Sequence, residues 1–395
     1  MPRAGGIFVV SGLQLGIDMS IHENRRQFVG LLLVKPAIAF GTQANSALEI
    51  GIVGCGGRGA YVGAFFQEFA GARIVALADP IESQFAVIRE KLSLPEVRTY
   101  TGVDGHRQLA ASRLDAVVIE SPPHFHPEQA EAAVAEGKHV FSAKPIATDV
   151  SGSRRFLRAG EEAKGRLSFL VDYQTRAQAA FQEAALRVHR GDIGEPVLGH
   201  VYYHGGRNRF HSTDGLTPEL ARLRNWLHDK TLSGDIIVEQ NVHVIDVANW
   251  YLGGHPLKAW GTGGRKARLD GDVWDHFIVT YWYPNNVKVD FSSAQFLKGY
   301  GDLCIRLYGS RGVVDSHYNG LLRILGENPW PGVEKDPTFR DGAIENVKRF
   351  AAAVRSGKPV NNVPEAVESN LTAILGRTAA YEGREMSWDE MLARG

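Results

Sequence analysis

Apolar strand-like runs and longer helix-like segments alternate through the first half of the chain. Short apolar runs bounded by turn residues are typical of strands buried in a parallel sheet. Such runs occur at residues 48–53, 73–78, 115–120, 139–142 and 167–171, and helices are predicted at 60–70, 81–92, 103–112, 127–136 and 149–165. Strands alternating with helices predict a doubly wound parallel α/β sheet over residues 48–172.

The pattern changes after residue 172. A helix is predicted at 177–190, and strand-like runs follow with few helices between them, at 197–204, 258–265, 275–283, 287–295 and 304–309. Their alternation of apolar and polar positions is typical of an open, mostly antiparallel sheet. Residues 173–395 are therefore predicted to form an α+β domain, which helices at 346–356 and 364–381 complete.

One predicted helix in this second domain, residues 234–252, carries several polar residues. Glu239, His243 and Asp246 are spaced i, i+4 and i+7, so a continuous helix would place all three on one face.

A glycine-rich loop joins the first strand to the first helix. It fits G-x-G-x-x-G, in which the glycines permit a tight turn, a close approach to a pyrophosphate and close helix packing. The helix N-terminus then offers N–H groups to phosphates. The predicted phosphate-binding residues are Gly54, Gly56, Gly57, Arg58 and Gly59. The alternative is a glycine-rich turn in another kind of α/β protein.

Asp79 ends the second strand about 20 residues after the glycines, where a carboxylate accepts hydrogen bonds from the adenosine ribose. The same charge would repel a 2′-phosphate. The sequence therefore predicts a Rossmann domain that binds NAD rather than NADP.

Two further segments fall at the carboxyl ends of predicted strands, where ligands of doubly wound sheets bind. The first contains Ser121, Pro122 and His126, and the second ends at Lys144. All four residues are predicted to lie at the cofactor.

The segment SPPHFHPEQAEAAVAEGKHVFSAKP resembles the pattern T-P-x-x-x-H … G-K-H-V-x-x-E-K-P of the glucose-fructose oxidoreductase, inositol dehydrogenase and rhizopine-catabolism family, Gfo/Idh/MocA. The resemblance covers nearly all the chain after residue 47. The 234–252 stretch is similar to that family's G-G-x-x-x-D-x-G-x-H-x-x-D helix, with Glu239 in place of Asp. Ala143 stands where the family has Glu before Lys-Pro, so any help from that carboxylate in orienting the lysine is missing.

The resemblance brings His243 toward the nicotinamide, opposite Lys144. Oxidation of a secondary alcohol needs a base near the hydroxyl, and histidine suits that role near neutral pH. We assign His243 as general acid/base, Glu239 as its orienting partner and Lys144 as the group that holds the reacting oxygen. Further substrate contacts are predicted at Tyr173, Arg176, Trp226 and Asp246. The alternative for His243 is a structural histidine in the core, and for Lys144 a surface lysine. For Tyr173, Arg176 and Trp226 the alternative is packing at an interface.

Composition narrows the function classes. Lys plus Arg and Asp plus Glu number 44 each, so no net field favours nucleic acid. The chain has two cysteines, Cys55 and Cys304, and no disulfide is predicted. His124, His126, Glu239 and His243 are possible metal ligands, but no HExxH or cysteine pair accompanies them, so no metal is predicted.

The leading hypothesis is an oxidoreductase that uses NAD, which we expect to be tightly bound, to transfer hydride from a secondary hydroxyl of a sugar, polyol or glycoside. The first alternative is an NAD-dependent glycoside hydrolase working through transient ring oxidation and elimination. The second is a non-catalytic sugar- or cofactor-binding protein. The family resemblance also implies a homo-oligomer.

Residues 1–47 do not read as part of the fold. Arg25-Arg26-Gln27-Phe28 resembles a twin-arginine export signal, residues 28–34 form a short apolar run, and Met19 is a plausible start. Lys35 interrupts the apolar run, which departs from that pattern. We expect a periplasmic protein with no membrane span after signal removal; the alternative is a basic tail on a cytoplasmic enzyme.

Overall fold

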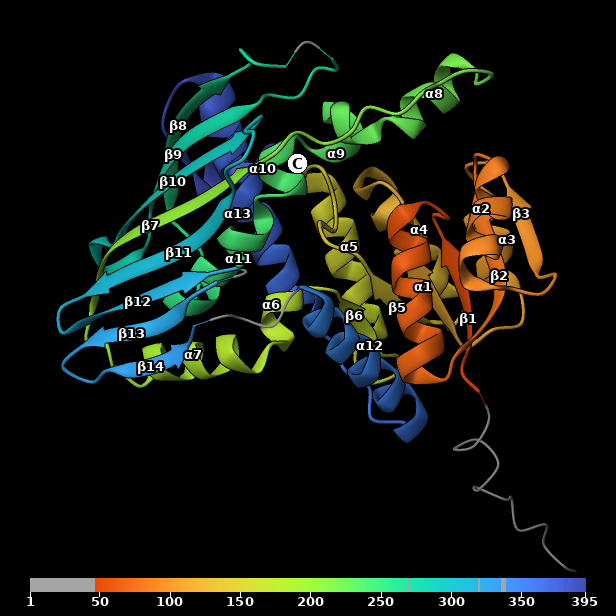
Figure 1. Ribbon diagram of the computed structural model, residues 1–395, viewed down its shortest axis with the longest axis horizontal. Coiled ribbons are helices and arrows are strands. Elements are labelled where there is room, and N and C mark those ends of the chain that lie inside the picture. The colour runs from red at the N-terminus through yellow and green to blue at the C-terminus, as the bar shows by residue number, and fades with distance from the viewer. Residues whose placement is uncertain (1–46, 269, 319, 335–338) are drawn as a thin grey trace, which may run out of the picture. The chain divides into compact units, whose positions relative to one another are not determined.

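The computed structural model describes residues 47–268, 270–318, 320–334 and 339–395, and the predicted export signal lies outside them. The first sheet has six parallel strands in the order β3-β2-β1-β4-β5-β6 (Figure 1). The order reverses at β1, as in a doubly wound fold. The strands are β1 (Glu49–Val53), β2 (Arg73–Asp79), β3 (Arg98–Thr101), β4 (Ala116–Ile119), β5 (His139–Ser142) and β6 (Phe169–Val171).

Helices connect these strands close to where the sequence predicts them. Apolar β1 side chains such as Ile50 and Ile52 are fully buried, which explains why both faces of the sheet need helical cover. The helices are α1 (Gly57–Ala70), α2 (Ser83–Leu92), α3 (Gly105–Ala111), η1 (Pro123–Phe125), α4 (His126–Ala135) and α5 (Val150–Ala163).

The second sheet has nine strands in the order β14-β13-β12-β11-β7-β10-β9-β8-β15. All neighbours are antiparallel except β7 and β10, which pair in parallel. The predicted open, mostly antiparallel sheet is therefore confirmed. Its strands are β7 (Pro196–Gly205), β8 (Lys258–Gly264), β9 (His276–Trp282), β10 (Lys288–Gln295), β11 (Asp302–Gly309), β12 (Gly312–His317), β13 (Leu322–Gly326), β14 (Trp330–Val333) and β15 (Met386–Ser387).

The helices of the second half include one clear departure from prediction. They are α6 (Gln174–Ala177), α7 (Ala179–His189), α8 (Pro218–Arg224), η2 (Trp226–His228), α9 (Lys230–Ser233), α10 (Ile236–Glu239), α11 (Val242–Leu252), η3 (Pro284–Asn286), α12 (Phe339–Ser356), α13 (Val363–Glu382) and α14 (Trp388–Leu392). The single helix predicted at 234–252 is wrong, because it divides into α10 and α11.

A wide turn separates α10 from α11. The amide of Asn241 donates to the carbonyl of Ile236, five residues back, as in a π-type turn. The Gln240 side chain is also engaged at this point, because it donates to Asn208 Oδ1 over 3.0 Å. The extra residue in the turn changes the angle between Glu239 and His243 that the i, i+4 spacing predicts.

Helix α12 returns the chain to the first domain. The Phe350 ring centroid lies 6.0 Å from that of Phe66 in α1 and 5.6 Å from that of Phe141 in β5. Asn362 continues this return, since its side chain bonds the N–H and the carbonyl of Val171 at 2.7 and 2.9 Å. Residues of the predicted second domain, 173–395, thus pack into the predicted first domain, 48–172.

Helix α13 contacts both α5 and β8, and so links the two sheets. In the part of the chain that the structure describes, no helix combines the length and apolar character needed to cross a membrane.

Candidate active site

The glycine loop between β1 and α1 lines a pocket at the carboxyl ends of the first sheet's strands. Gly54 has φ of 91°, and a Cβ there would lie 2.6 Å from the backbone of Glu120. A Cβ at Gly59 would lie 2.0 Å from the Gly54 carbonyl oxygen. At Gly56, by contrast, a Cβ would meet nothing within 4 Å, because that position faces the open pocket. Room for a phosphate therefore lies in front of the α1 N-terminus.

Asp79 shapes this loop as well as facing the pocket. Its Oδ2 accepts from the Cys55 amide (2.7 Å) and its Oδ1 from the Ile81 amide (2.8 Å). Burial raises the pKa of Asp79, while the two amides and the charge of Arg224 act to lower it. Asp79 lies at the position expected for a ribose-binding carboxylate, and these residues fit a dinucleotide.

The opposite wall of this pocket comes from the second domain. An excursion that we call the arm, residues 206–229, carries Leu223, Arg224 and Trp226 into the pocket lining. Trp226, predicted to contact substrate, thus lies with Asp79 on the dinucleotide pocket. Figure 1 shows α8 of the arm standing away from the nine-stranded sheet. Asn225 closes the base of the arm, because its side chain bonds both the N–H and the carbonyl of His211 (2.7 and 3.0 Å).

Lys144, Glu239, His243 and Tyr318 form a cluster at the carboxyl end of β5. Lys144 Nζ donates to the Glu239 backbone carbonyl (2.6 Å) and lies 3.5 Å from Glu239 Oε1. His243 Nδ1 lies 3.0 Å from the Tyr318 hydroxyl. The structure therefore places the Glu239 carboxylate, predicted to orient His243, against Lys144, and gives Tyr318 the contact with the imidazole.

The electrostatics of this cluster favour a neutral histidine. Burial, with the positive charges of Lys144 and Arg58, holds the pKa of His243 well below its ordinary value. Burial also lowers the pKa of Lys144, although the charge of Glu239 opposes that effect. A neutral imidazole beside an ammonium group is suited to accept a proton from a bound hydroxyl.

Arg58 leaves the phosphate loop and enters a row of buried carboxyls. Its Nη2 donates to Asp172 Oδ2, and its Nε lies 3.5 Å from Glu120 Oε2. Burial works to lower the pKa of Arg58, but Asp172 and Glu120 hold it above its ordinary value. The structure therefore pairs Arg58, predicted as a phosphate ligand, with acids at the ends of β4 and β6.

Of the residues predicted to lie at the cofactor, Ser121 and Pro122 line the same pocket as the glycine loop, whereas His126 does not. His126 is 1% exposed, and its Nε2 contacts the Ser121 carbonyl oxygen at 2.7 Å. Burial lowers the pKa of His126 to about 4. Through its contact with the Ser121 carbonyl, the buried and neutral His126 holds the loop that carries Ser121 in place.

Three predicted substrate contacts are packed inside the second domain. Arg176 makes a bidentate pair with Asp246, at 2.9 Å from Nε to Oδ2 and from Nη2 to Oδ1. Ser369 donates to the same carboxylate (2.7 Å), and Asp246 is fully buried. Tyr173 is 2% exposed. The structure gives these residues an architectural position: Arg176, Asp246 and Ser369 tie α6, α11 and α13 together, and Tyr173 is buried beside them.

A second pocket lies at the C-terminal end of β7 and the start of β11. One of its lining residues, Gln240, directly follows Glu239 in the sequence. Its lining is rich in groups that bond hydroxyls: Tyr203, His204, Asn208, Gln240, Asp302 and His317. Burial raises the pKa of Tyr203 above its ordinary value, and the charge of Glu239 adds to this effect.

Comparison with known proteins identifies the chain. Residues 48–171 match "Oxidoreductase family, NAD-binding Rossmann fold", and residues 181–315 match "GFO/IDH/MocA C-terminal domain". The chain belongs to the GFO/IDH/MocA oxidoreductase family. The predicted family and NAD-binding Rossmann domain are confirmed.

Two curated relatives of this family share sequence with the chain. Inositol 2-dehydrogenase of Pseudomonas fluorescens is 32% identical over 198 residues, a match that covers 48% of this chain and only 58% of that protein. Myo-inositol 2-dehydrogenase of Thermotoga maritima is 24% identical over 325 residues, which covers 79% of this chain and 90% of that protein.

The fold is shared with solved structures of the family. Scyllo-inositol dehydrogenase from Lactobacillus casei, solved with bound NAD(H) and scyllo-inositol, superposes with a TM-score of 0.67 at 18% identity. The superposition covers 87% of this chain and 100% of that one.

Sequence reasoning missed several residues of this GFO/IDH/MocA site. Tyr318 follows β12 in a segment with no recognisable motif, and Leu223 and Arg224 lie on the arm, which has no strand or strong helix pattern. Glu120 did carry a signal, because it is an acid that ends an otherwise apolar strand, Ala-Val-Val-Ile.

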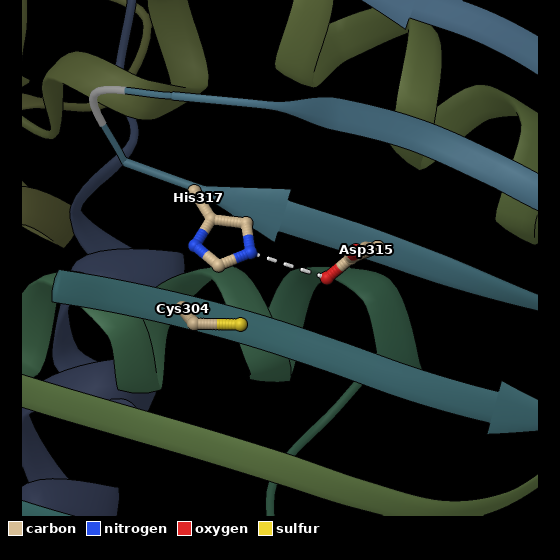
Figure 2. A group of neighbouring side chains, drawn as sticks. All are labelled: Cys304, Asp315 and His317. Carbon is tan, nitrogen blue, oxygen red and sulfur yellow. Dashed lines mark ion pairs between the residues drawn. The ribbon is translucent and has the colours of Figure 1, made fainter.

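A further group of side chains, of which His317 also lines the second pocket, contains possible metal ligands. Figure 2 shows Cys304, Asp315 and His317, which offer atoms within 4.8 Å of one another. His317 lies 3.3 Å from Asp315 and 2.8 Å from Asp302, and Arg306 donates to Asp315 (2.7 Å). Contacts with Cys304 and Asp302 raise the pKa of His317 to about 9. Two positive side chains therefore already balance these carboxylates and join β11 to β12.

Proposed function

We propose that this family member oxidises a secondary hydroxyl of a cyclic polyol of the inositol class, with NAD as hydride acceptor. The observation that carries the proposal is the cluster of Lys144, Glu239 and His243 beside the dinucleotide pocket. The names of the curated relatives support a polyol substrate. The polar lining of the second pocket supports it too, because a polyol needs many hydrogen-bonding partners.

His243 takes the proton of the reacting hydroxyl. Its lowered pKa keeps the imidazole neutral at pH 7. Because Nδ1 is engaged by Tyr318, we assign Nε2 as the atom that accepts the proton of the substrate hydroxyl. The Lys144 ammonium, held by Glu239, binds the reacting oxygen and stabilises the negative charge that develops on it. Bound NAD supplies the hydride acceptor.

The second pocket holds the rest of the substrate. Tyr203, Asn208 and Gln240 offer hydroxyl and amide groups to the non-reacting hydroxyls. Binding at these groups would orient one hydroxyl toward Lys144 and His243.

The decisive test begins with the purified protein. Denaturation followed by mass spectrometry of the supernatant should release NAD(H) if the cofactor is retained. NADH formation at 340 nm is then followed with myo-inositol, scyllo-inositol and other polyols. Turnover of a polyol supports the proposal. Release of an aglycone from aryl glycosides without net NADH would replace it with the redox-assisted glycosidase.

We further propose that Arg25-Arg26 directs export of the folded protein. The motif and the apolar run after it support this, and replacing both arginines with lysine should leave the protein in the cytoplasm on cell fractionation. A cytoplasmic wild-type protein would contradict the proposal.

We also propose that the exposed face of the nine-stranded sheet joins copies of the chain. Exposed apolar side chains on neighbouring strands support it, including Trp260 (43% exposed) and Ile278 (51%). Light scattering after gel filtration should give a multimer, and a monomeric mass at working concentration would contradict it.

A further inference from the structure

The parallel register lines up four residues at the carboxyl edge of the first sheet. Val53 pairs with Ile119, Ile119 with Ser142, and Ser142 with Val171. The residues that directly follow these partners are therefore Gly54, Glu120, Ala143 and Asp172. Glu120 and Ala143 are neighbours on adjacent strands, about 4.8 Å apart.

Glu120 is a buried acid without a hydrogen bond. Its side chain is fully buried, and among the described residues neither carboxyl oxygen has a hydrogen-bond partner. Arg58 gives its hydrogen bond to Asp172 instead, and its Nε stays 3.5 Å from Glu120. The Arg58 charge compensates the carboxyl in part, but buried polar atoms are usually hydrogen-bonded, so a group that completes its bonding is expected.

Glu120 also belongs to the lining of the dinucleotide pocket, so its unbonded carboxyl lies just behind the surface that a ligand would contact. Burial raises the pKa of Glu120 to about 8, while Arg58 and Lys144 act to lower it. The carboxyl is therefore placed near two cations, Arg58 of the glycine loop and Lys144 of the catalytic cluster.

The order of the strands says which part of a dinucleotide comes near Glu120. Asp79 ends β2, Gly54 follows β1, Glu120 follows β4 and Lys144 lies just past β5, and these strands are consecutive in the sheet. A ligand with its adenosine at Asp79 and its diphosphate at Gly54 reaches β4 with its second ribose. Its nicotinamide then reaches β5, where Lys144 and His243 lie.

We propose that Glu120 binds the hydroxyls of the nicotinamide-side ribose. Ala143, its neighbour on the adjacent strand, has no polar group that could do so. This inference rests on the proposed function only for the identity of the dinucleotide. The bound ribose completes the hydrogen bonding of the Glu120 carboxyl. It also fixes the nicotinamide end against Lys144, so Glu120 acts on hydride transfer as a positioning residue.

Binding of three ligands tests the proposal by calorimetry. NAD and ADP-ribose carry the second ribose, whereas ADP lacks it. In Glu120→Ala and Glu120→Gln, affinity for NAD and ADP-ribose should fall about 10- to 100-fold, as for a lost hydrogen bond to a charged or buried acid. Affinity for ADP should change less than about twofold. Glu68→Ala, an exposed acid on α1, is the matched control and should bind all three ligands like wild type.

A double variant tests the role of position. Adding Ala143→Glu to Glu120→Ala should return most of the NAD and ADP-ribose affinity, because the new carboxyl comes from the neighbouring strand. Equal losses for all three ligands, no loss at all, or no recovery in the double variant would overturn the proposal. If these ligands behave as expected while no polyol is oxidised, the proposed function fails and the assignment of Glu120 stands.

Discussion

Glu120 and His243 both hold a titratable group away from water, and burial shifts their pKa values in opposite directions. The pKa of Glu120 is raised to about 8 and that of His243 is lowered well below its usual value. Both shifts keep the group uncharged near pH 7. The site thus holds an uncharged acid and an uncharged base close to two cations, Arg58 and Lys144.

Glu120→Gln is expected to be more stable than wild type, by a margin that grows with pH. In the unfolded chain the carboxyl loses its proton near pH 4.5, but in the folded protein it keeps the proton up to about pH 8. Wild-type stability therefore falls as pH rises through this window, and the amide removes that loss. Thermal unfolding without ligand at pH 5, 6.5 and 8 measures the difference in Tm. A constant difference would show that Glu120 is ionised throughout.

His243→Ala should lower kcat for polyol oxidation by about 10²- to 10⁴-fold, the usual contribution of a general base. The Kd for NAD should change little, because His243 does not line the dinucleotide pocket. Stopped-flow kinetics and fluorescence titration give the two quantities. Tyr318→Phe serves as the comparison: it removes the hydroxyl that contacts Nδ1 but leaves the imidazole in place, and should cost far less. An unchanged kcat in His243→Ala would assign the base elsewhere.

At the scale of elements, the arm brings a second-domain surface onto a first-domain pocket. α8 has no buried residue, and Asn225 joins the two sides of the arm through its hydrogen bonds with the His211 backbone. A covering element with so few packing contacts is suited to open and close around a cofactor. It supports the expectation that the cofactor is held tightly.

Removing the arm's contacts should speed the loss of cofactor. Arg224→Ser combined with Trp226→Phe is expected to raise the NADH dissociation rate about 10-fold or more, equivalent to about 1.4 kcal/mol. Release of NADH into excess unlabelled NAD, followed by fluorescence, measures the rate. Energy transfer from tryptophan to bound NADH should also decrease, since Trp226 lines the pocket. Arg209→Ser, an exposed change on the same arm, is the control, and equal rates in both variants would contradict the role of the pocket-lining pair.

Elements governed by local pattern could be predicted from sequence, and those governed by distant partners could not. The strands of the first sheet and the glycine loop follow from apolar runs and from backbone conformations that only glycine tolerates, as at Gly54. The break after Glu239 was missed because a wide turn at Asn241 leaves no signal in the residue spacing. The pairing of Arg176 with Asp246 was missed because it depends on the approach of α6 and α11, 70 residues apart.

On the scale of the whole molecule, the last third of the chain completes the first domain. Phe350 packs between α1 and β5, Asn346 donates to Asp172 (2.9 Å), and Asn362 bonds to Val171. The Asp172 carboxylate that holds Arg58 is thus itself held by α12. The two halves of the sequence share one network around the site.

A fragment of residues 47–172 is therefore expected not to fold cooperatively by itself. It lacks α12, so Phe66 on α1 and Phe141 on β5 would lose the cover that Phe350 gives them. Thermal circular dichroism of the fragment should show no sharp transition, and calorimetry should detect no binding of ADP. In the full chain, Phe350→Ala should lower the free energy of unfolding by about 3–5 kcal/mol, as for a large cavity in a core. A fragment that melts sharply and binds ADP would show that α12 is dispensable.

A ribosome delivers the glycine loop and its strands long before it delivers α12. The emerging dinucleotide-binding sheet must wait with the packing around Phe66 and Phe141 incomplete until residues 339–362 leave the exit tunnel. Cofactor capture by a newborn molecule thus becomes a late event. A molecule loaded with its nucleotide is therefore one in which α12 has already been synthesised.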